Sequence, residues 1–168
     1  MEILHTELFP QIDLCLGLFT EVQNSSELKE KLKDLNCSFI NPRLLCDLDH
    51  LIIGITRALF TREFSKSKTG NFFLDVVYYL SGTGNIKDTL KKFGISEENQ
   101  ETIVFCTSSE DYQNVKNLIR GNEKSIHGLG EFKNMQELAK EFHLSPGEKS
   151  SLSNSIVSIH NRIAIKDL

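Results

Sequence analysis

Apolar and polar residues alternate near the start of the chain, where residues 12–18 read Ile-Asp-Leu-Cys-Leu-Gly-Leu. A repeat of two is the period of a strand with one buried face. Together with residues 2–8 and Pro10, this pattern predicts two short strands joined at the proline. Two further short strands are predicted at residues 39–40, before a proline that keeps the chain extended, and at the apolar run 102–106.

Apolar residues at spacings of three and four predict several helices. A helix over residues 28–35 is expected to be capped by Asn24, with a glutamate three residues after the cap. Asp47 or Asp49 caps a helix over residues 51–64, which is apolar on most sides and is therefore expected in the core. Two amphipathic helices follow: one behind Ser109 carries Tyr112, Val115, Leu118 and Ile119, and one behind Asn134 carries Met135, Leu138, Ala139 and Phe142.

The most distinctive segment is residues 71–95, NFFLDVVYYLSGTGNIKDTLKKFGI. It joins a nearly unbroken apolar run, a turn with two glycines and a short amphipathic stretch with three lysines. The apolar run, residues 72–80, has the β-branched and aromatic side chains of a strand and also suits a buried helix. Its own pattern does not decide between the two.

The last predicted helix begins at Ser145, with Pro146 in its first turn and Glu148 at the spacing of a capping box. No charged residue occurs from 150 to 161, whereas surface helices normally carry lysine and glutamate and interface cores are depleted of both. Two interpretations stay open: the helix docks on a partner, or it packs on the protein's own core with a small polar exterior. Its apolar stripe consists of Leu152, Ile156, Ile159 and Ile163.

These elements predict one domain over residues 1–168 with an α/β (mixed α+β) fold, in which a small mixed sheet of short strands packs with several helices and the C-terminal helix is partly free for docking. The composition, 39% hydrophobic and 25% charged, is that of an ordinary globular protein with one core. No apolar run approaches the roughly 20 residues of a membrane helix, and the N-terminus lacks signal-peptide features. We therefore expect an intracellular protein with no membrane partner.

Charge is distributed unevenly along the chain. The formal net charge is −4, but residues 51–94 carry seven basic and three acidic side chains, so this segment is +4 and the rest is −8. A basic zone on an acidic protein is suited to phosphate groups, although ordinary solvated helix faces give the same pattern.

The sequence contains no motif of enzyme chemistry. Phosphate-binding GxxxxGK[ST] and GxGxxG loops, the GxSxG nucleophile elbow and the HExxH zinc motif do not occur. The four cysteines show no CxxC spacing and the histidines no ligand spacing, so we expect buried free thiols, no metal and no cofactor.

Asp47, Asp49 and His50 nevertheless define an alternative hypothesis, a small cytosolic hydrolase or transferase of unknown substrate. Helix capping and the helix dipole explain two carboxylates at a helix start adequately. The sequence therefore favours a binding protein without catalytic residues.

Residues 38–60, SFINPRLLCDLDHLIIGITRALF, followed by residues 71–95, closely resemble the PRPK-binding protein family, the accessory subunits of the EKC/KEOPS complex. The shared features are an INP strand end, a buried helix ending in Ala-Leu, an LSG…I turn and the ending KKFGI, in the same order with matching gaps. The resemblance extends more weakly from about Leu4 to the C-terminal IAIKDL, and so covers almost the whole chain.

The resemblance implies a protein that is not an enzyme and needs no metal. Family members bind and regulate the small atypical kinase/ATPase subunit of the complex through their terminal helical region, and contact the other subunits indirectly. They also help hold tRNA, and archaeal members read its 3′ CCA end. A different, metal-containing subunit of the complex forms N6-threonylcarbamoyladenosine at tRNA position 37. A cytoplasmic and nuclear location is expected on the same grounds.

The family pattern also implies that residues 72–80 are a buried helix and that residues 86–93 are a helix with Gly94 as its C′ residue. Carried over to this chain, it places kinase binding on Leu152, Ile156, Ile159 and Ile163. It places tRNA binding on Gly82, Asn85, Ile86, Lys87, Lys91 and Lys92, with Lys66, Lys68 and Arg62 as outer phosphate contacts. Lysines grip the phosphates of a single strand, and an apolar side chain such as Ile86 contacts its splayed bases.

One departure from the family pattern concerns the turn before Ile86. Many archaeal members have an Arg-Gln pair where this chain has Gly84 and Asn85. An arginine that pairs with a phosphate or stacks on a base is therefore missing. We expect weaker reading of the CCA end, or a shift of that role to the neighbouring lysines.

Overall fold

One antiparallel sheet organises the computed structural model, which describes residues 1–98 and 100–167. The strands lie in the order β1-β2-β4-β3. The same edge of β2 pairs with two strands: β1 lies beside the first half of β2, and β5 lies beside the second half. The strands are β1 Glu2–Leu4, β2 Leu14–Thr20, β3 Ser38–Ile40, β4 Thr102–Cys106 and β5 Asn122–Lys124. The predicted mixed α+β class is confirmed. The sheet, expected to be mixed, is antiparallel in each pair of strands that the structure describes.

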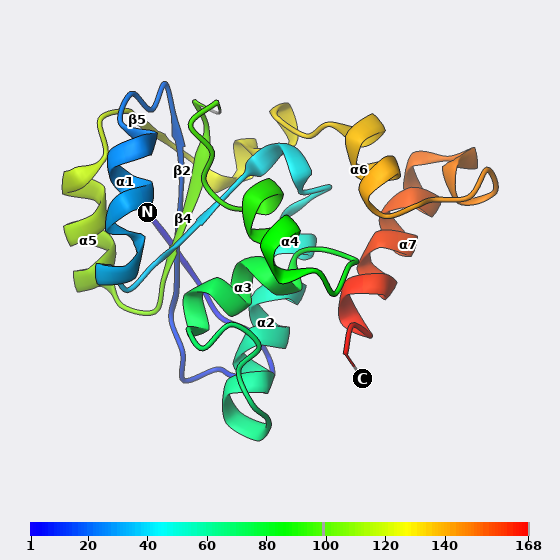
Figure 1. The fold of residues 1–168 in the computed structure, drawn as a ribbon, viewed down its shortest axis with the longest axis horizontal. Helices are drawn as coiled ribbons and strands as arrows, with labels where there is room; N and C mark the ends of the chain where they lie inside the picture. The colour runs from blue at the N-terminus through cyan, green and yellow to red at the C-terminus, as the bar shows by residue number, and fades with distance from the viewer. Residues whose placement is uncertain (99, 168) are drawn as a thin grey trace.

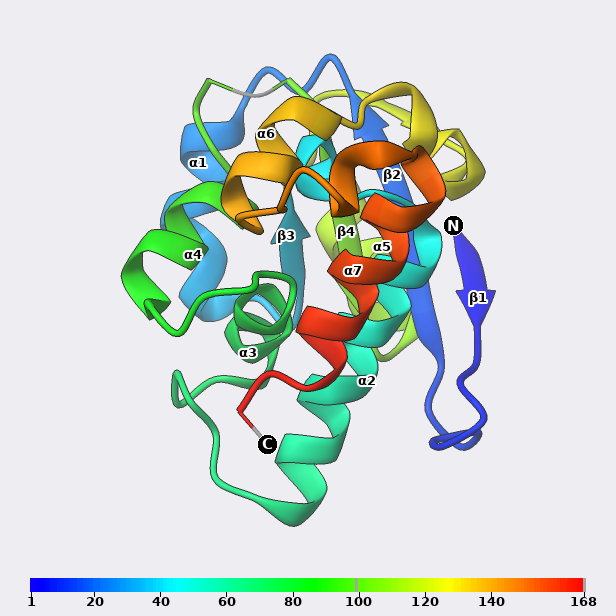
Figure 2. The same ribbon diagram turned by 90° about the vertical axis from the view of Figure 1, so that its right-hand side faces the viewer.

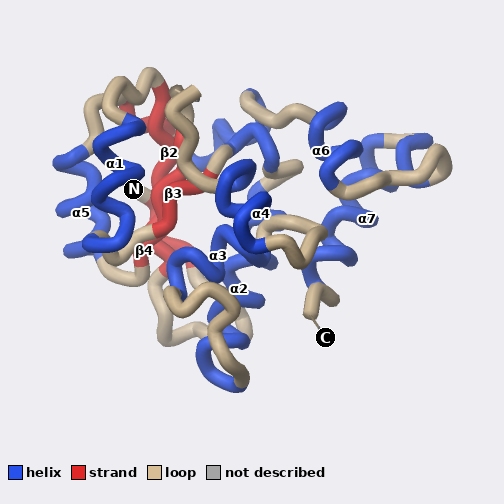
Figure 3. The backbone as a smooth tube through the Cα atoms, in the orientation of Figure 1, coloured by secondary structure: helices blue, strands red, loops and turns tan. Residues whose placement is uncertain are grey.

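Helices cover both faces of this sheet (Figure 1). Figure 3 shows the strands in red between α1 and α5 on one side and the remaining helices on the other. The helices are α1 Ser25–Lys31, α2 Leu48–Phe64, α3 Phe72–Tyr79, α4 Ile86–Phe93, α5 Ser109–Leu118, α6 Met135–Glu141 and α7 Leu152–Ala164. Within the described ranges, none of them has both the length and the apolar content needed to cross a bilayer.

Strand β2 is buried on both faces because a helical layer presses on each of them. Leu14, Leu16 and Leu18 belong to the main core, shared with α2, α3 and α7, whereas Cys15 and Phe19 belong to a second core beneath α1 and α5. The prediction of a half-buried strand is therefore wrong. The alternation separates two apolar cores instead of separating core from solvent.

Two helix starts differ from the predicted caps. Asn24 precedes α1, but its side chain contacts the segment after α5: its amide donates to Leu118 O and its Oδ1 accepts the Arg120 N–H, both at 2.9 Å. Ser108, one residue before the expected Ser109, caps α5. The Asn24 side chain thus contributes to tertiary structure, and only the backbone oxygen of this residue contributes to the helix that follows it.

The last helix begins later than its capping box predicts. Ser145 and Glu148 do form the box, with the Ser145 N–H donating to Glu148 Oε2 at 2.7 Å and the Glu148 N–H donating to Ser145 Oγ at 3.3 Å. This box begins only the 3-10 turn Glu148–Ser150. The backbone is extended again at Ser151, φ −148°, whose side chain caps α7.

The central segment folds as the family pattern implied, with one difference. Residues 72–79 form helix α3, which Asn71 caps, and residues 86–93 form α4. Gly94 ends α4 with φ −84°, and not in the left-handed conformation expected of a C′ glycine. A glycine is needed there for space, because an added Cβ would lie 2.5 Å from Leu90 O.

Gly17 is where α5 presses on β2, since a Cβ added there would lie 1.7 Å from the Tyr112 hydroxyl oxygen. That hydroxyl also donates to Glu123 Oε1 at 2.6 Å, which holds the ring in place. We expect Gly17→Ala to lower the free energy of unfolding by about 1–3 kcal/mol through overpacking, as measured by urea unfolding. The matched control is Gly130→Ala, where no atom lies within 4 Å of the Cβ position. Equal effects of the two substitutions would contradict this account.

Lys166 is buried and fastens the end of the chain to α3. Its Nζ donates to Tyr78 O and to Ser81 Oγ (3.0 Å) and lies 3.4 Å from the centroid of the Tyr78 ring. Its backbone oxygen accepts a hydrogen bond from Arg57 of α2 at 2.6 Å. Burial lowers the pKa of Lys166 to about 7, against a smaller opposing effect of Asp167.

The depressed pKa of Lys166 predicts a pH-dependent stability. Between about pH 7 and pH 10 the unfolded chain binds a proton that the folded chain does not, so linkage makes the folded state more stable as pH rises through this window. We expect the difference in unfolding free energy between the unmodified protein and Lys166→Met to grow by up to about 3 kcal/mol across it. Urea unfolding at several pH values measures the difference. Lys140→Met, at an exposed lysine, is the control. A difference in unfolding free energy between the unmodified protein and Lys166→Met that stays constant with pH would rule out this linkage.

Candidate docking helix and basic cleft

The inner side of α7 belongs to the protein's own core. Figure 2 shows α7 lying against α2, and the side chains of Ile159 and Ile163 are fully buried in the main core. Ile156 is half-buried against the same core. The prediction that Ile159 and Ile163 contact a kinase is therefore corrected, because the chain itself already covers both.

The outer side of α7 exposes apolar side chains without a charged residue. Val157 is 54% exposed on that side and Leu152 is 52% exposed at the N-terminal end, while Ile165, just beyond the helix, is 64% exposed. Exposed Asn154 and Asn161 separate them. We call these five residues the outer face of α7. Sequence reasoning missed Val157 and Ile165 because they lie off the regular stripe, which marks the buried side.

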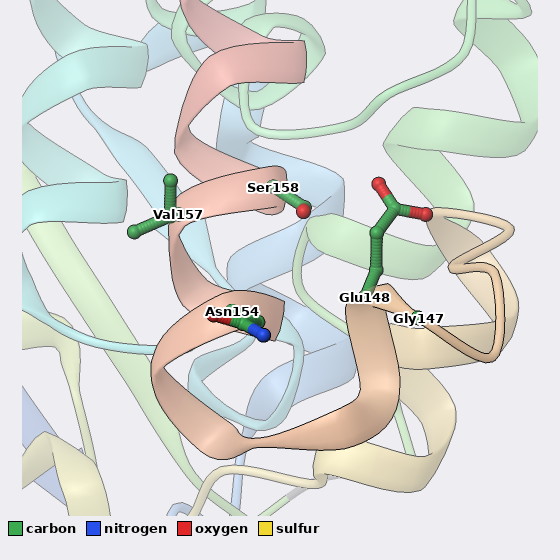
Figure 4. Close-up of a pocket in the computed structure, with 5 residues that line it drawn as sticks. All are labelled: Gly147, Glu148, Asn154, Val157 and Ser158. Carbon is green, nitrogen blue, oxygen red and sulfur yellow. The ribbon is translucent and has the colours of Figure 1, made fainter.

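A shallow hollow of about 230 Å³ opens beside Val157, between α7 and the 3-10 turn before it (Figure 4). Arg162 holds Glu148 at its rim, with Nη1 2.9 Å from Oε1 and Nη2 3.1 Å from Oε2. The hydrogen bond from Arg162, followed by that from the Ser145 N–H, lowers the pKa of Glu148 to about 2. The lining of the hollow thus includes both a fixed carboxylate and an exposed apolar side chain.

The turn before α4 is held by packing and capping. Asn85 Oδ1 accepts the Asp88 N–H at 3.1 Å and begins the helix. A Cβ added at Gly82 would lie 3.0 Å from the Phe142 ring. Gly82 and Asn85 therefore have structural roles that need no RNA, whereas Ile86 is 36% exposed at the helix start.

A larger cleft of about 1090 Å³ runs along α4, past α1, β3 and α3. Its apolar lining comes from Leu32, Phe39, Leu44, Leu74, Val77, Leu90 and Ile95. Its basic lining is Lys29, Lys33, Arg43, Lys87, Lys91 and Lys92, and its acidic lining is Glu97, Glu98 and Glu137. A cleft that combines cations with an apolar floor suits a single nucleic-acid strand, whose phosphates and bases need both.

The structure brings only some of the predicted tRNA residues to this cleft. Lys87, Lys91 and Lys92 line it, whereas Gly82, Asn85 and Ile86 do not. Sequence reasoning missed Lys29, Lys33 and Arg43 because they lie outside the basic zone at residues 51–94. The fold brings them to the cleft from three places: Lys29 from α1, Lys33 from the 3-10 turn after α1, and Arg43 from the 3-10 turn after β3.

Ion pairs divide the basic side chains of the cleft into two groups. Lys92 Nζ lies 2.9 Å from Glu141 Oε1 and 3.0 Å from Asp88 Oδ2, and the hydrogen bond with Glu141 is the main reason that its pKa is raised. A phosphate would have to compete with both carboxylates, so Lys92 mainly joins α4 to α6.

Two more basic side chains of the cleft also have acidic neighbours: Lys29 lies 3.7 Å from Glu97, and Arg43 lies 3.3 Å from Glu101. In the part of the chain that the structure describes, no ion pair engages Lys33, Lys87 or Lys91. Those three lysines are the cations available to a phosphate.

The three outer phosphate contacts lie away from the cleft. Lys68 pairs with Asp167 at 3.3 Å, and the Arg62 guanidinium lies 4.3 Å from the centroid of the Phe72 ring. Lys66 is exposed on the loop between them. None of the three lines the cleft, so the structure does not join them to Lys87 and Lys91.

The acid–base cluster is not arranged for catalysis. His50 is fully buried, its Nε2 donates to Leu80 O at 2.7 Å, and burial lowers its pKa to about 4. Asp47 Oδ1 accepts the His50 N–H at 2.8 Å and caps α2, while the Asp49 side chain is exposed. The three groups do not converge, and neither cleft described above includes them. Asp47 thus acts as a helix cap and His50 as a buried contact between α2 and Leu80.

Another cluster was not apparent from sequence spacing. His160 of α7 places its Nε2 2.9 Å from Asp47 Oδ1 and 3.6 Å from Cys46 Sγ. Burial, followed by the charge of Asp47, raises the pKa of the Cys46 thiol, which leaves it a poor nucleophile.

Comparison with known proteins places these features in a family. The family model described as kinase binding protein CGI-121 matches residues 19–167. The chain is similar to the EKC/KEOPS complex subunit TPRKB of Danio rerio, with 26% identity over 170 residues that cover 96% of this chain and 95% of the relative. It is also similar to the EKC/KEOPS complex subunit CGI121 of Yarrowia lipolytica, with 28% identity over 149 residues, 84% of this chain and 86% of the relative. The predicted resemblance is confirmed, and the chain belongs to the kinase binding protein CGI-121 family.

Proposed function

We propose that this protein is a non-catalytic subunit of an EKC/KEOPS complex. It binds and regulates the small atypical kinase/ATPase subunit and helps hold tRNA while N6-threonylcarbamoyladenosine is formed at position 37, in the cytoplasm and the nucleus. Family membership and the names of its relatives support a place in this complex. The observation that carries the proposal in the structure is an uncharged, partly apolar outer face on the terminal helix.

The outer face of α7 is the proposed kinase-binding surface. Helix α2 covers the other side of α7, so a partner reaches the helix from the outside. Interface cores favour apolar side chains and lack lysine and glutamate, as this face does. Of the four residues first expected to bind the kinase, Leu152 belongs to the outer face. Ile156 lies outside that set and packs partly on the core, but it is partly exposed and stays in the proposal as a neighbouring contact.

The cleft beside α4 is the proposed contact with tRNA. Lys87, Lys91 and Lys33 supply cations without acidic partners in the described ranges, and Leu74 and Leu90 add apolar lining to the same cleft. Counter-ion release by such lysines supplies much of the affinity for a single strand, and apolar contact holds its bases. The 3′ CCA end is the single-stranded part of tRNA that suits the cleft.

For the kinase surface, we expect Val157→Glu and Leu152→Glu each to weaken binding of the kinase subunit at least tenfold, because each would bury an unpaired charge in the interface. Both side chains are exposed, so the variants remain folded. Copurification and calorimetry with the kinase subunit measure the effect.

The control for this test is Leu8→Glu, an exposed apolar residue (70%) remote from α7 in sequence. It is expected to leave kinase binding unchanged. Unaltered affinity in both α7 variants would remove the outer face from the proposal. Ile159→Glu is unsuitable, because it places a charge in the core and unfolds the chain.

For the cleft, we expect the double variant Lys87→Glu/Lys91→Glu to weaken tRNA binding about tenfold or more. The slope of log affinity against log salt should fall by up to about 0.7 for each phosphate that a lysine no longer neutralises. Filter binding or fluorescence anisotropy across a salt series measures both quantities.

The control makes the same charge change at Lys124 and Lys140, two exposed lysines outside the cleft. If this control weakens binding equally, the effect is one of net charge and the cleft is not the site. A tRNA trimmed of its CCA end separates end reading from general phosphate binding: it should lose affinity for the unmodified protein and little for the double variant.

A further inference from the structure

Three metal-ligand side chains meet where the start of α2 faces α7. Cys46 and Asp47 lie next to each other at the N-cap of α2, and His160 reaches them from α7. The distances are 3.6 Å from Cys46 Sγ to His160 Nε2, 3.6 Å from Cys46 Sγ to Asp47 Oδ1, and 2.9 Å from Asp47 Oδ1 to His160 Nε2. Among residues 1–98 and 100–167, this is the group whose three donor atoms gather closely enough for one ion.

The spacing of these atoms is close to that of three corners of a zinc tetrahedron. With Zn–S near 2.3 Å and Zn–N or Zn–O near 2.0–2.1 Å, tetrahedral angles put sulfur roughly 3.6 Å from nitrogen or oxygen, and nitrogen roughly 3.3 Å from oxygen. The two sulfur distances fit directly, and the third requires a movement of about 0.4 Å along the partly exposed Asp47 and His160 side chains. Thiolate, imidazole and carboxylate are also the three ligand types that zinc takes in proteins.

The surroundings hold the first two ligands in place. The His50 N–H donates to Asp47 Oδ1 at 2.8 Å, and the Cys46 N–H donates to His50 Nδ1 at 3.3 Å. His50 is itself fixed by its bond to Leu80 O at 2.7 Å. Such contacts behind the ligands restrict their orientation and strengthen metal binding.

We propose that Cys46, Asp47 and His160 bind one zinc ion that joins the start of α2 to α7. The Asp47 and His160 side chains are 33% and 21% exposed, so an ion reaches them from solvent and a water completes the tetrahedron. The ion replaces the thiol proton and the hydrogen bond between His160 and Asp47. Its effect is to fix α7, and with it the outer face, on the core. The proposal rests on neither kinase nor tRNA binding.

Cobalt titration of the chelator-treated, full-length protein tests the site. One equivalent of Co²⁺ is expected to give thiolate-to-cobalt charge-transfer absorption and the intense visible bands of tetrahedral cobalt, and Zn²⁺ should displace it. Cys46→Ser should abolish the charge-transfer absorption, and His160→Gln should weaken binding at least about tenfold. Zinc should raise the melting temperature of the unmodified protein but not that of His160→Gln.

The control is His5→Gln, since His5 Nε2 also lies 2.9 Å from a carboxylate, Asp13 Oδ1, without a cysteine in a shared ligand group. It should titrate like the unmodified protein. Absence of charge-transfer absorption, its persistence in Cys46→Ser, or unchanged affinity in His160→Gln would overturn the proposal in favour of a metal-free hydrogen-bonded triad. His160 is partly exposed, so its variant remains informative even where Cys46→Ser does not fold.

Discussion

The burial of α2 between the sheet, α3 and α7 is the constraint on which the rest of the structure depends. Gly54 allows the end of α3 to approach, since a Cβ there would lie 2.4 Å from the Leu80 side chain. His50 and Thr61 then fasten α2 to the same helix, through Leu80 O at 2.7 Å and the Tyr79 hydroxyl at 2.9 Å. Because these polar groups are buried, each needs its partner, so α2 and α3 have one relative position.

This fixed pair of helices decides which surfaces remain for partners. Helix α7 covers α2 and presents only its outer face, while α3 forms one wall of the cleft that α4 borders. The same pair of helices accounts for the cluster of Asp47, Asp49 and His50, which suggested acid–base chemistry in the sequence. The role of His50 in it is structural. His50 is neutral because burial lowers its pKa to about 4, and its nitrogens both have partners.

The sequence predicted the elements better than their surroundings. Periodicity located β2 and α6, and continuous apolar runs located α2 and β4, because both signals depend only on neighbours along the chain. The apolar stripe of α7 predicted one buried side of the helix. The same stripe arises whether a partner or the protein's own α2 covers that side, and Ile159 and Ile163 are covered by the protein itself. The cleft lysines Lys29 and Lys33, and the meeting of His160 with Asp47, depend on contacts between distant segments that no local pattern contains.

The two proposed surfaces share no residue, so a molecule bound at one does not occupy a residue of the other. Their chemistry also keeps them apart: the outer face of α7 has no cation to attract phosphate, and the cleft lysines would be costly to bury in a protein interface. They are nevertheless joined through the core, because Lys166, two residues past the end of α7, bonds Tyr78 O and Ser81 Oγ at the end of α3, just before the turn that leads into α4. One buried lysine therefore ties the end of α7 to the segment that leads into α4.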